Sequence, residues 1–447
     1  MKPAMSNLTR LMMAALSAAL FSLTALAQTA FEQIAADPLK AGGIYNMYNE
    51  NPGPFTPAPK GYKPFYISHY GRHGARHLSS NSQYRQIRDI LVKAHEDGAL
   101  TAKGEDLYAR YMKMFPLVDG RGGDLTEAGA REHRGIAQRM LDNYPQVFKG
   151  KRLIDARSTD VPRCIISMDN FCDQLKRTHP KLRIEKTVDK ADMAFLNPHS
   201  KYNPDNTETD IGHNNKYAYW QPAYKQMCHE NADPEIFFAR LFKDWNYIRQ
   251  FGNPEDLEYL MYYLACGTQC LENGFDFWDL FSFEEKCLLW EAGSYLFFCS
   301  KGPDDIQGGR QWAFCWTLAQ DILDGYDKDM AEGRAARLRF GHDIAIMSFM
   351  TLMDIEGWST PAPTPHEAKD LWQNYNIPMG ANIQFIFYKN RRGHILVRFM
   401  NNENDIRFPI PSETAPYYDW KELRTYIEQR IATARHIIAT TPAPPKK

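Results

Sequence analysis

The chain has 447 residues, of which 44% are hydrophobic and 24% charged. This composition can bury a large core and excludes an intrinsically disordered chain. The 53 basic and 54 acidic side chains give a formal net charge of −1, so no overall basic field exists to recruit nucleic acid. Because a single domain seldom reaches this length, we expect two domains.

The first residues have the pattern of a secretory signal peptide. Lys2 and Arg10 give a positive start, residues 11–26 are mostly apolar, and a small-x-small cleavage site occupies residues 25–27. The pattern predicts residues 1–27 as a signal peptide, cleavage near Ala27, and export to the periplasm or the extracellular space. The alternative is an uncleaved N-terminal anchor, although the apolar stretch is short for a membrane span. We expect no membrane span after cleavage, because no later run is apolar enough.

A histidine between two arginines follows the first predicted strand. Residues 64–70 are an apolar run typical of a buried strand, and residues 72–76 read RHGAR. Loops at strand ends are where open α/β sheets bind ligands. An imidazole such as that of His73 can attack phosphorus and carry the phosphoryl group covalently. The guanidinium forks of Arg72 and Arg76 match phosphate oxygens and stay charged. The pattern therefore predicts a phosphoryl-binding site.

A metal site is the competing interpretation of this stretch. His69, His73 and His77 are spaced by four, as ligands on one face of a helix would be. Gly71 and Gly74 lie within that spacing and argue against a helix. We therefore expect no metal at this place.

A second basic segment stands at the start of a predicted helix. Residues 157–163 read RSTDVPR; they follow a short strand at residues 152–156 and open a helix that runs to about residue 175. Pro162 suits the first turn of that helix. A helix start favours anions through its free N–H groups and its dipole, and Arg163 would add a third guanidinium fork there. The alternative is a solvated arginine.

A third segment combines a histidine with an aspartate. An alternating run ends at Gly341, and His342, Asp343 and an apolar stretch follow. Taken alone, this would be a strand end whose polar pair forms local hydrogen bonds. Together with the two preceding segments, it indicates a functional site.

Together the three segments resemble the motifs of the histidine phosphatase superfamily, branch 2, which includes acid phosphatases, phytases and multiple inositol polyphosphate phosphatases. Residues 72–76 resemble its Arg-His-Gly-X-Arg signature, residues 157–163 its Arg-Ser-Thr-Asp-x-x-Arg segment, and residues 342–343 its His-Asp motif. Residues 123–129 resemble its Leu-Thr-x-x-Gly segment, where Thr126 can cap a helix. Residues 395–403 resemble its closing strand with Asn-Glu.

The resemblance implies a fold, a reaction and a set of site residues. The implied fold is α/β, a mixed sheet sandwiched by helices, with an inserted, smaller all-α cap domain. The implied reaction is hydrolysis of a small phosphate ester in two steps, without cofactor or metal and with an acidic pH optimum. The implied catalytic residues are His73, the nucleophile, and Asp343, the acid that protonates the leaving oxygen. The implied phosphate ligands are Arg72, Arg76, Arg163 and His342.

The substrate stays open at this stage. The Asn-Glu ending favours inositol polyphosphates such as phytate, yet the multiple inositol polyphosphate phosphatases often carry His-Ala-Glu where this chain has His342 and Asp343. His77 also stands where the family often has proline. A broad-specificity acid phosphatase is the alternative, and a phosphate-binding protein without turnover is an alternative of another class. The oligomeric state is not indicated.

The cysteine count and the distribution of aromatic and polar residues bear on the remaining parts of the chain. Eight cysteines would permit disulfides in an exported protein, but the sequence does not pair them. We expect an α/β core at residues 28–190, a helical and aromatic cap insertion at 191–335, and a second core part at 336–440. Further elements are expected as helices at 84–100 and 420–432, and as strands at 182–187, 383–388 and 394–400.

Overall fold

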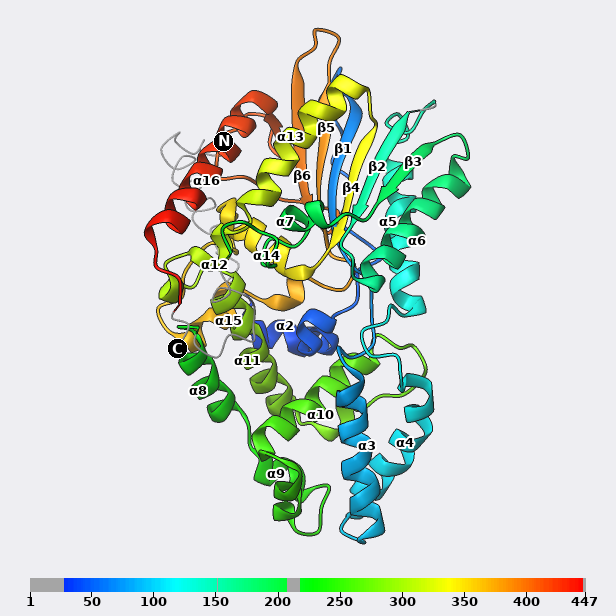
Figure 1. Ribbon diagram of the computed structural model, residues 1–447, viewed down its shortest axis with the longest axis vertical. Coiled ribbons are helices and arrows are strands. Elements are labelled where there is room, and N and C mark those ends of the chain that lie inside the picture. Colours follow the sequence, from blue (N-terminus) through cyan, green and yellow to red (C-terminus); the bar gives the residue numbers. More distant parts are fainter. Residues whose placement is uncertain (1–27, 151, 207–217, 445–447) are drawn as a thin grey trace, which may run out of the picture.

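The structure is a computed structural model that describes residues 28–150, 152–206 and 218–444 (Figure 1). The expected signal peptide, residues 1–27, lies outside these residues and stays a prediction. Within the described ranges, no helix combines the length and the apolar character needed to cross a membrane.

One mixed sheet runs through the upper half of the molecule in Figure 1. The strand order is β3-β2-β4-β1-β5-β6-β7, and β8 pairs with β6. The strands β3, β2, β4 and β1 are parallel, whereas β5 runs antiparallel to β1. The strands are β1 (Lys63–Arg72), β2 (Leu153–Ser158), β3 (Arg183–Thr187), β4 (Ala336–Gly341), β5 (Asn382–Lys389), β6 (Ile395–Asn401), β7 (Asn404–Asp405) and β8 (Tyr417–Asp419). Because the parallel strands end at one edge, the three sequence motifs that follow β1, β2 and β4 meet there.

Helices cover both faces of this sheet, as the sequence predicted. Side chains alternate along β1: Tyr66 and Tyr70 belong to one hydrophobic core, and Ile67 to the other. The first face carries α13 (Trp316–Glu332), α14 (Asp343–Leu352) and α16 (Trp420–Thr440). The second carries α5 (Glu127–Asn143) and α6 (Pro162–Thr178). The predicted α/β class is confirmed.

A second group of helices gathers beyond the carboxyl edge of the parallel strands, in the lower half of Figure 1. They are α3 (Asn81–Glu96), α4 (Ala102–Val118), α8 (Gln221–Asn231), α9 (Pro234–Ala239), α10 (Pro254–Thr268) and α11 (Phe283–Lys301). Short elements connect the larger ones: α2 (Ala30–Ala36), α7 (Met193–Leu196), α12 (Arg310–Ala313), α15 (Ala368–Leu371), η1 (Pro38–Tyr45), η2 (Lys190–Asp192), η3 (Trp245–Phe251), η4 (Trp278–Leu280), η5 (Asp305–Gln307), η6 (Pro365–Glu367) and η7 (Asn374–Asn376). The helical part thus draws on residues 81–118 as well as on the expected insertion, while α13 lies on the sheet. The expected boundaries at 191 and 335 stay a prediction.

Local signals explain where the helices begin and end. Thr126 caps α5 by accepting a hydrogen bond from the Gly129 amide, and Pro162 occupies the first turn of α6. Ser80 caps α3, which ends before Gly98, a residue with φ of 63°. The last helix runs eight residues beyond the expected end at residue 432, because apolar positions such as Ala434 and Ile437 continue its packed face.

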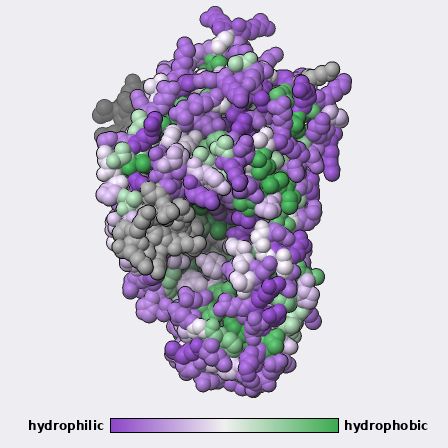
Figure 2. Space-filling view, viewed as in Figure 1, coloured by the Kyte–Doolittle hydropathy of each residue, from purple (hydrophilic) through white to green (hydrophobic). Residues whose placement is uncertain are grey.

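All eight cysteines lie within the described residues, and each is a free thiol. Seven of them are buried, and the thiol of Cys228 is half-buried. They act as small apolar side chains in the core. On the face shown in Figure 2, hydrophilic side chains predominate and apolar ones occur in small groups between them, as is usual for a protein in water.

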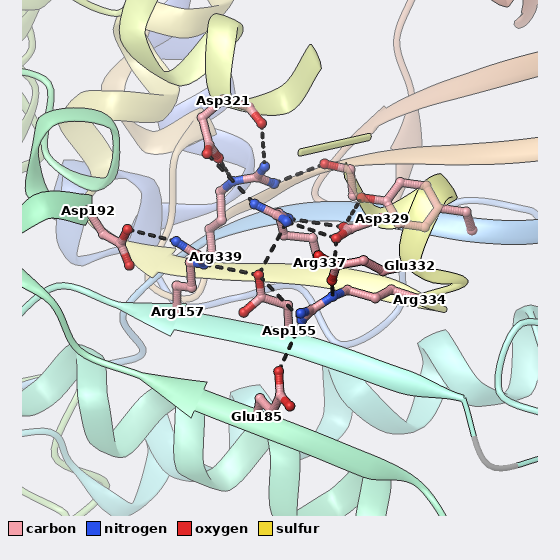
Figure 3. A network of polar contacts seen from close by, with 12 residues as sticks. Asp155, Arg157, Glu185, Asp192, Asp321, Asp329, Glu332, Arg334, Arg337 and Arg339 are labelled. Atoms are coloured by element: carbon pink, nitrogen blue, oxygen red, sulfur yellow. Dashed lines mark hydrogen bonds and ion pairs between the residues drawn. The ribbon is translucent and has the colours of Figure 1, made fainter. Parts of the chain in front are cut away.

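On the face of the sheet that carries α13 lies a network of ion pairs with a buried centre (Figure 3). Arg337 and Arg339 point from β4 toward α13, opposite to Leu338 and Phe340. The members are Asp155, Arg157, Glu185, Asp192, Asp321, Asp329, Glu332, Arg334, Arg337 and Arg339. The network connects β2, β4 and α13 on the side of the sheet away from α6.

Loss of one carboxylate from this network is expected to destabilise the fold strongly. Asp329 is fully buried and accepts hydrogen bonds from Arg337 Nε (3.0 Å), Arg337 Nη2 (2.8 Å) and the Tyr66 hydroxyl (2.8 Å). The change Asp329→Ala removes both hydrogen bonds of Asp329 to the buried Arg337 guanidinium and leaves it only the longer ion pairs with Asp155 (3.4 Å) and Asp321 (3.8 Å), which costs about 3–5 kcal/mol of unfolding free energy. The matched control is Asp327→Ala, which breaks an exposed pair with Arg424 and costs at most about 1 kcal/mol. Equal losses in urea unfolding of the two variants would contradict this account of the network.

Candidate active site

The segment after β1 is held from both sides. The His73 amide donates to the Gly341 carbonyl at the end of β4 (3.0 Å), and the Gly380 amide donates to the His73 carbonyl (3.0 Å). At Gly74, a Cβ atom would lie 2.4 Å from the Gly129 carbonyl oxygen in the first turn of α5. Only glycine permits this close approach. The backbone of His73 is therefore fixed against three other elements.

The imidazole of His73 is buried and held in one tautomer. Its Nδ1 lies 2.9 Å from the Gly74 carbonyl oxygen, which can only accept, so Nδ1 carries the proton and Nε2 keeps a free lone pair. Burial lowers the pKa of His73 well below its usual value, and the positive charges of Arg163, Arg72 and Arg76 lower it further. The ring is therefore neutral, with an unprotonated Nε2, even in weak acid.

Arg72 and Arg76 surround the histidine in fixed orientations. Arg72 is fully buried; its Nη1 donates to the carbonyl oxygens of Ile44 (2.8 Å) and Ile377 (2.9 Å). Arg76 Nη1 donates to the Tyr45 hydroxyl at 3.1 Å, and its guanidinium lies 4.8 Å from the centre of the Tyr45 ring. Each Nε has no hydrogen-bond partner among the described residues. Both guanidinium groups thus retain donors for an anion.

Arg163 and His342 complete the group of phosphate ligands expected from the sequence. Arg163 lies in the first turn of α6, and its Nε is also unpartnered within the described part of the chain. The rings of His342 and His73 are 5.8 Å apart. Burial lowers the pKa of His342 to about 4, and Arg163 contributes to the shift. As a neutral ring, His342 offers an anion an N–H group and no full charge.

Asp343 begins α14 and faces Arg72. Its Oδ2 lies 2.9 Å from Arg72 Nη2, and its Oδ1 accepts a hydrogen bond from the Ile344 amide (2.9 Å). Burial raises the pKa of Asp343, but Arg72, followed by His342 and Arg76, outweighs burial and holds the pKa below the usual range. The carboxyl is therefore ionised in this environment. The role of acid catalyst that the sequence predicts for Asp343 requires the protonated form, which a nearby negative charge would favour.

The comparisons with known proteins follow this geometry. A family model described as histidine phosphatase superfamily (branch 2) matches residues 71–402, which is most of the chain. The chain belongs to branch 2 of the histidine phosphatase superfamily. The family predicted from the sequence is thereby confirmed. A search of curated proteins returned no match.

Solved structures of similar fold include enzymes of this superfamily. The multiple inositol polyphosphate phosphatase of Bifidobacterium longum, in complex with inositol hexasulfate, is 19% identical with a TM-score of 0.73, covering 87% of this chain and 97% of that one. The phytase of D. castellii is 15% identical with a TM-score of 0.69, covering 91% and 88%. The phytase of Klebsiella sp. ASR1 is 14% identical with a TM-score of 0.52, covering 83% and 97%. At these identities the likeness concerns the fold.

In this histidine phosphatase, all six residues predicted for the site come together at the edge of the sheet. The three histidines of the metal interpretation have different ring neighbours. The ring centre of His69, on β1, lies 5.3 Å from that of Phe171 and 5.5 Å from that of Phe340, whereas the ring centre of His77 lies 6.4 Å from that of Tyr84. No group of three or more potential metal ligands occurs among the described residues. The three histidines therefore have separate surroundings.

Sequence reasoning missed Glu132, whose carboxyl supports the segment that carries His73. This buried carboxyl of α5 accepts hydrogen bonds from the Ala75 amide at 2.7 Å and the Tyr48 amide at 3.1 Å. It thereby ties the RHGAR segment to α5. A signal was present, because Glu132 stands among Ala128, Gly129 and Ile136 on the buried face of the helix. A charged residue at such a position is rarely buried without a specific partner.

The stability of the protein is expected to depend on pH through Glu132. Burial raises the pKa of Glu132 to about 7, although the two amide hydrogen bonds lower it. A carboxyl whose pKa is higher in the folded state than in the unfolded state stabilises the fold in acid, and that contribution is lost as pH rises toward 7. Between pH 4 and pH 8, the unfolding free energy of the wild type should fall by about 3 kcal/mol relative to that of Glu132→Gln.

Urea unfolding of the wild type and of Glu132→Gln across this pH range measures the difference in their unfolding free energies. The contributions of the other titrating groups cancel in that difference. The matched control is Glu284→Gln on the protein surface, which should show no such trend relative to the wild type. A pH-independent difference between the wild type and Glu132→Gln would show that Glu132 titrates normally in the fold.

Proposed function

We propose that this protein hydrolyses phosphate monoesters through a phosphohistidine intermediate on His73. One observation carries the proposal: a buried, neutral imidazole with a free Nε2 lies beside three arginines. This combination suits a nucleophile that attacks an anionic phosphorus centre, because the cations stabilise the transferring group while the imidazole stays unprotonated. Family membership supports the same reaction class.

The first step transfers the phosphoryl group to the enzyme. The Nε2 lone pair of His73 forms a bond to phosphorus as the bond to the leaving oxygen breaks. Asp343, protonated in the substrate complex, gives its proton to that oxygen. The three arginines and the N–H group of His342 hold the non-bridging oxygens and balance the charge spread over them.

The second step releases inorganic phosphate. Asp343, now ionised, takes a proton from a water molecule that attacks phosphorus, and the phosphorus–nitrogen bond breaks toward His73. The same carboxyl thus serves as acid and then as base. We propose that neither step needs a metal ion, since the guanidinium groups supply the positive charge.

We propose small phosphate monoesters as substrates, with inositol phosphates among them. The fold likeness to enzymes named multiple inositol polyphosphate phosphatase and phytase supports the inositol class. A broad-specificity acid phosphatase is the second candidate, favoured by the His342-Asp343 pair that replaces His-Ala-Glu. Export is proposed from residues 1–27 of the sequence alone, and cell fractionation with mass determination of the mature N-terminus tests it.

Phosphate release from p-nitrophenyl phosphate, a sugar phosphate and phytate at pH 4 to 8, with and without EDTA, tests the proposed reaction. We expect phosphate release that is strongest in acid and that EDTA leaves unchanged. Bound phosphate without release from any substrate would indicate the binding protein instead. Release abolished by EDTA would indicate a metal-dependent reaction.

A further inference from the structure

A cavity of about 320 Å³ opens beside the proposed acid catalyst. Asp343 and Arg76 both line it. Because Asp343 has to reach the oxygen of the departing alcohol, that alcohol must lie within hydrogen-bond distance of its carboxyl group. The cavity is therefore the place for the leaving group. Its volume is at the small end of the roughly 300–1,000 Å³ that is typical of small-molecule sites.

The walls of this cavity are aromatic and uncharged. Apart from Asp343 and Arg76, its described lining holds no charged side chain. The rings of Tyr45, Tyr262, Tyr263 and Phe297 line it together with the amides of Gln83 and Asn374. Aromatic faces suit the C–H faces of a ring, and amides suit its hydroxyl groups. Neither provides a counter-charge for a further phosphate.

The single cation of the lining is already engaged. Arg76 donates to the Tyr45 hydroxyl and to the His77 carbonyl oxygen (2.8 Å), and its remaining donors face the transferred phosphoryl group in the proposed reaction. A second phosphate on the leaving group would therefore enter a region with no free guanidinium or ammonium among the described residues. That phosphate would lose its hydration without gaining a cation in return.

Among the described residues, the neighbouring cavity carries more negative than positive charge. A second cavity, of about 650 Å³, shares Gln83 and Tyr263 with the first. Its described lining contains two carboxylates, Glu255 and Asp256, and one ammonium group, that of Lys225. This charge balance disfavours a polyanion that extends outward.

The basic side chains of α3 face other partners. Arg85, Arg88 and Lys93 form ion pairs with Asp119, Asp89 and Asp97, respectively. None of the three lines either cavity in the described residues. They form a solvated helix face and are not available as ligands for extra phosphates.

We infer, resting on the proposed function, that the substrate is an ester of a single phosphate with an uncharged ring alcohol, such as a sugar or polyol monophosphate. The ring stacks among the tyrosines, and its hydroxyl groups bond to Gln83 and Asn374. Highly phosphorylated rings are poor substrates, because their additional charges meet neutral walls and then the carboxylates of the second cavity.

A matched pair of substrates tests the inference. Inositol monophosphate and inositol hexakisphosphate share one ring and differ only in the number of phosphates. We expect kcat/KM for the monophosphate to exceed that for the hexakisphosphate by about tenfold or more, because the additional phosphates lose solvation beside the neutral walls without gaining a cation. The measurement uses the mature full-length protein at fixed pH and ionic strength.

A charge variant shows whether these walls are responsible. Gln83→Lys adds a cation at the boundary of the two cavities. It should lower the ratio of kcat/KM for the monophosphate to that for the hexakisphosphate about fivefold or more, and this effect should weaken with salt. Gln429→Lys, the same change at an exposed position on α16, should leave the ratio unchanged. Because the Ser80 amide donates to Gln83 Oε1 (3.1 Å), thermal unfolding of Gln83→Lys confirms that α3 remains intact.

The outcomes separate this inference from the proposed function. Equal or faster turnover of the hexakisphosphate by the wild type would overturn the inference, as would a ratio that folded Gln83→Lys leaves unchanged. Absence of phosphate release from both inositol compounds and from p-nitrophenyl phosphate would instead refute the proposed phosphatase activity.

Discussion

Replacement of His73 by alanine is expected to lower kcat for every phosphate monoester by roughly 10⁴-fold or more, as loss of a nucleophile does in other covalent enzymes. The reason is that no other described group in the site combines a free lone pair with the fixed orientation that the Gly74 carbonyl imposes on His73. Phosphate release at saturating substrate, in the presence of EDTA, measures the effect.

Two controls separate loss of the nucleophile from loss of the fold. His436→Ala removes an exposed imidazole on α16 and should leave kcat unchanged. His73→Ala should still bind inorganic phosphate by calorimetry, because Arg72, Arg76 and Arg163 remain. A folded His73→Ala variant with kcat within tenfold of the wild type would contradict the assignment of the nucleophile.

Replacement of Asp343 by asparagine is expected to lower kcat for a sugar phosphate by about 10²–10⁴-fold, the range typical of a lost general acid. The loss should be much smaller for p-nitrophenyl phosphate, because an acidic phenol leaves without being protonated. A kcat that falls equally for both leaving groups would show that Asp343 acts on something other than the leaving oxygen.

The pH dependence of kcat tests the same residue in another way. Arg72 and its neighbours keep the pKa of Asp343 low, and a bound phosphate dianion opposes them, so the pKa rises in the substrate complex. Because the protonated form reacts, kcat of the wild type should fall as pH rises through that higher pKa. The asparagine variant should lack this decline. Asp327→Asn, an exposed change, should retain the profile of the wild type.

Much of the sheet could be predicted from the sequence, because its strands are short apolar runs bounded by clear turns. The run at 64–70 became β1, and the run at 383–388 became β5. The pairing of distant strands could not be predicted from the sequence. The strand β4 lies between β1 and β2, and more than 170 residues separate β4 from β2 along the chain. The place of α3 and α4 beside the later helices depends on such tertiary packing and on no local signal.

The site residues were recognisable because each follows the end of a strand or opens a helix within a short motif. The protonation states of these residues could not be recognised from the sequence, because they depend on burial in the fold. Arg72 and Asp343 are 271 positions apart, and only the fold brings their side chains to 2.9 Å. Glu132 lies outside every motif, and the buried arginines of β4 occur in a run whose alternation is also typical of an exposed strand face.

The most direct test of the central claim is to trap the phosphoenzyme. Substrate carrying labelled phosphate is mixed with the wild type, quenched in alkali within milliseconds, digested and examined by mass spectrometry, with Asp343→Asn as a variant expected to slow hydrolysis of the intermediate. We expect base-stable, acid-labile label on the peptide that contains His73, and none in His73→Ala. Full turnover with no label under conditions that trap a known phosphohistidine enzyme, or label on a different residue, would contradict it.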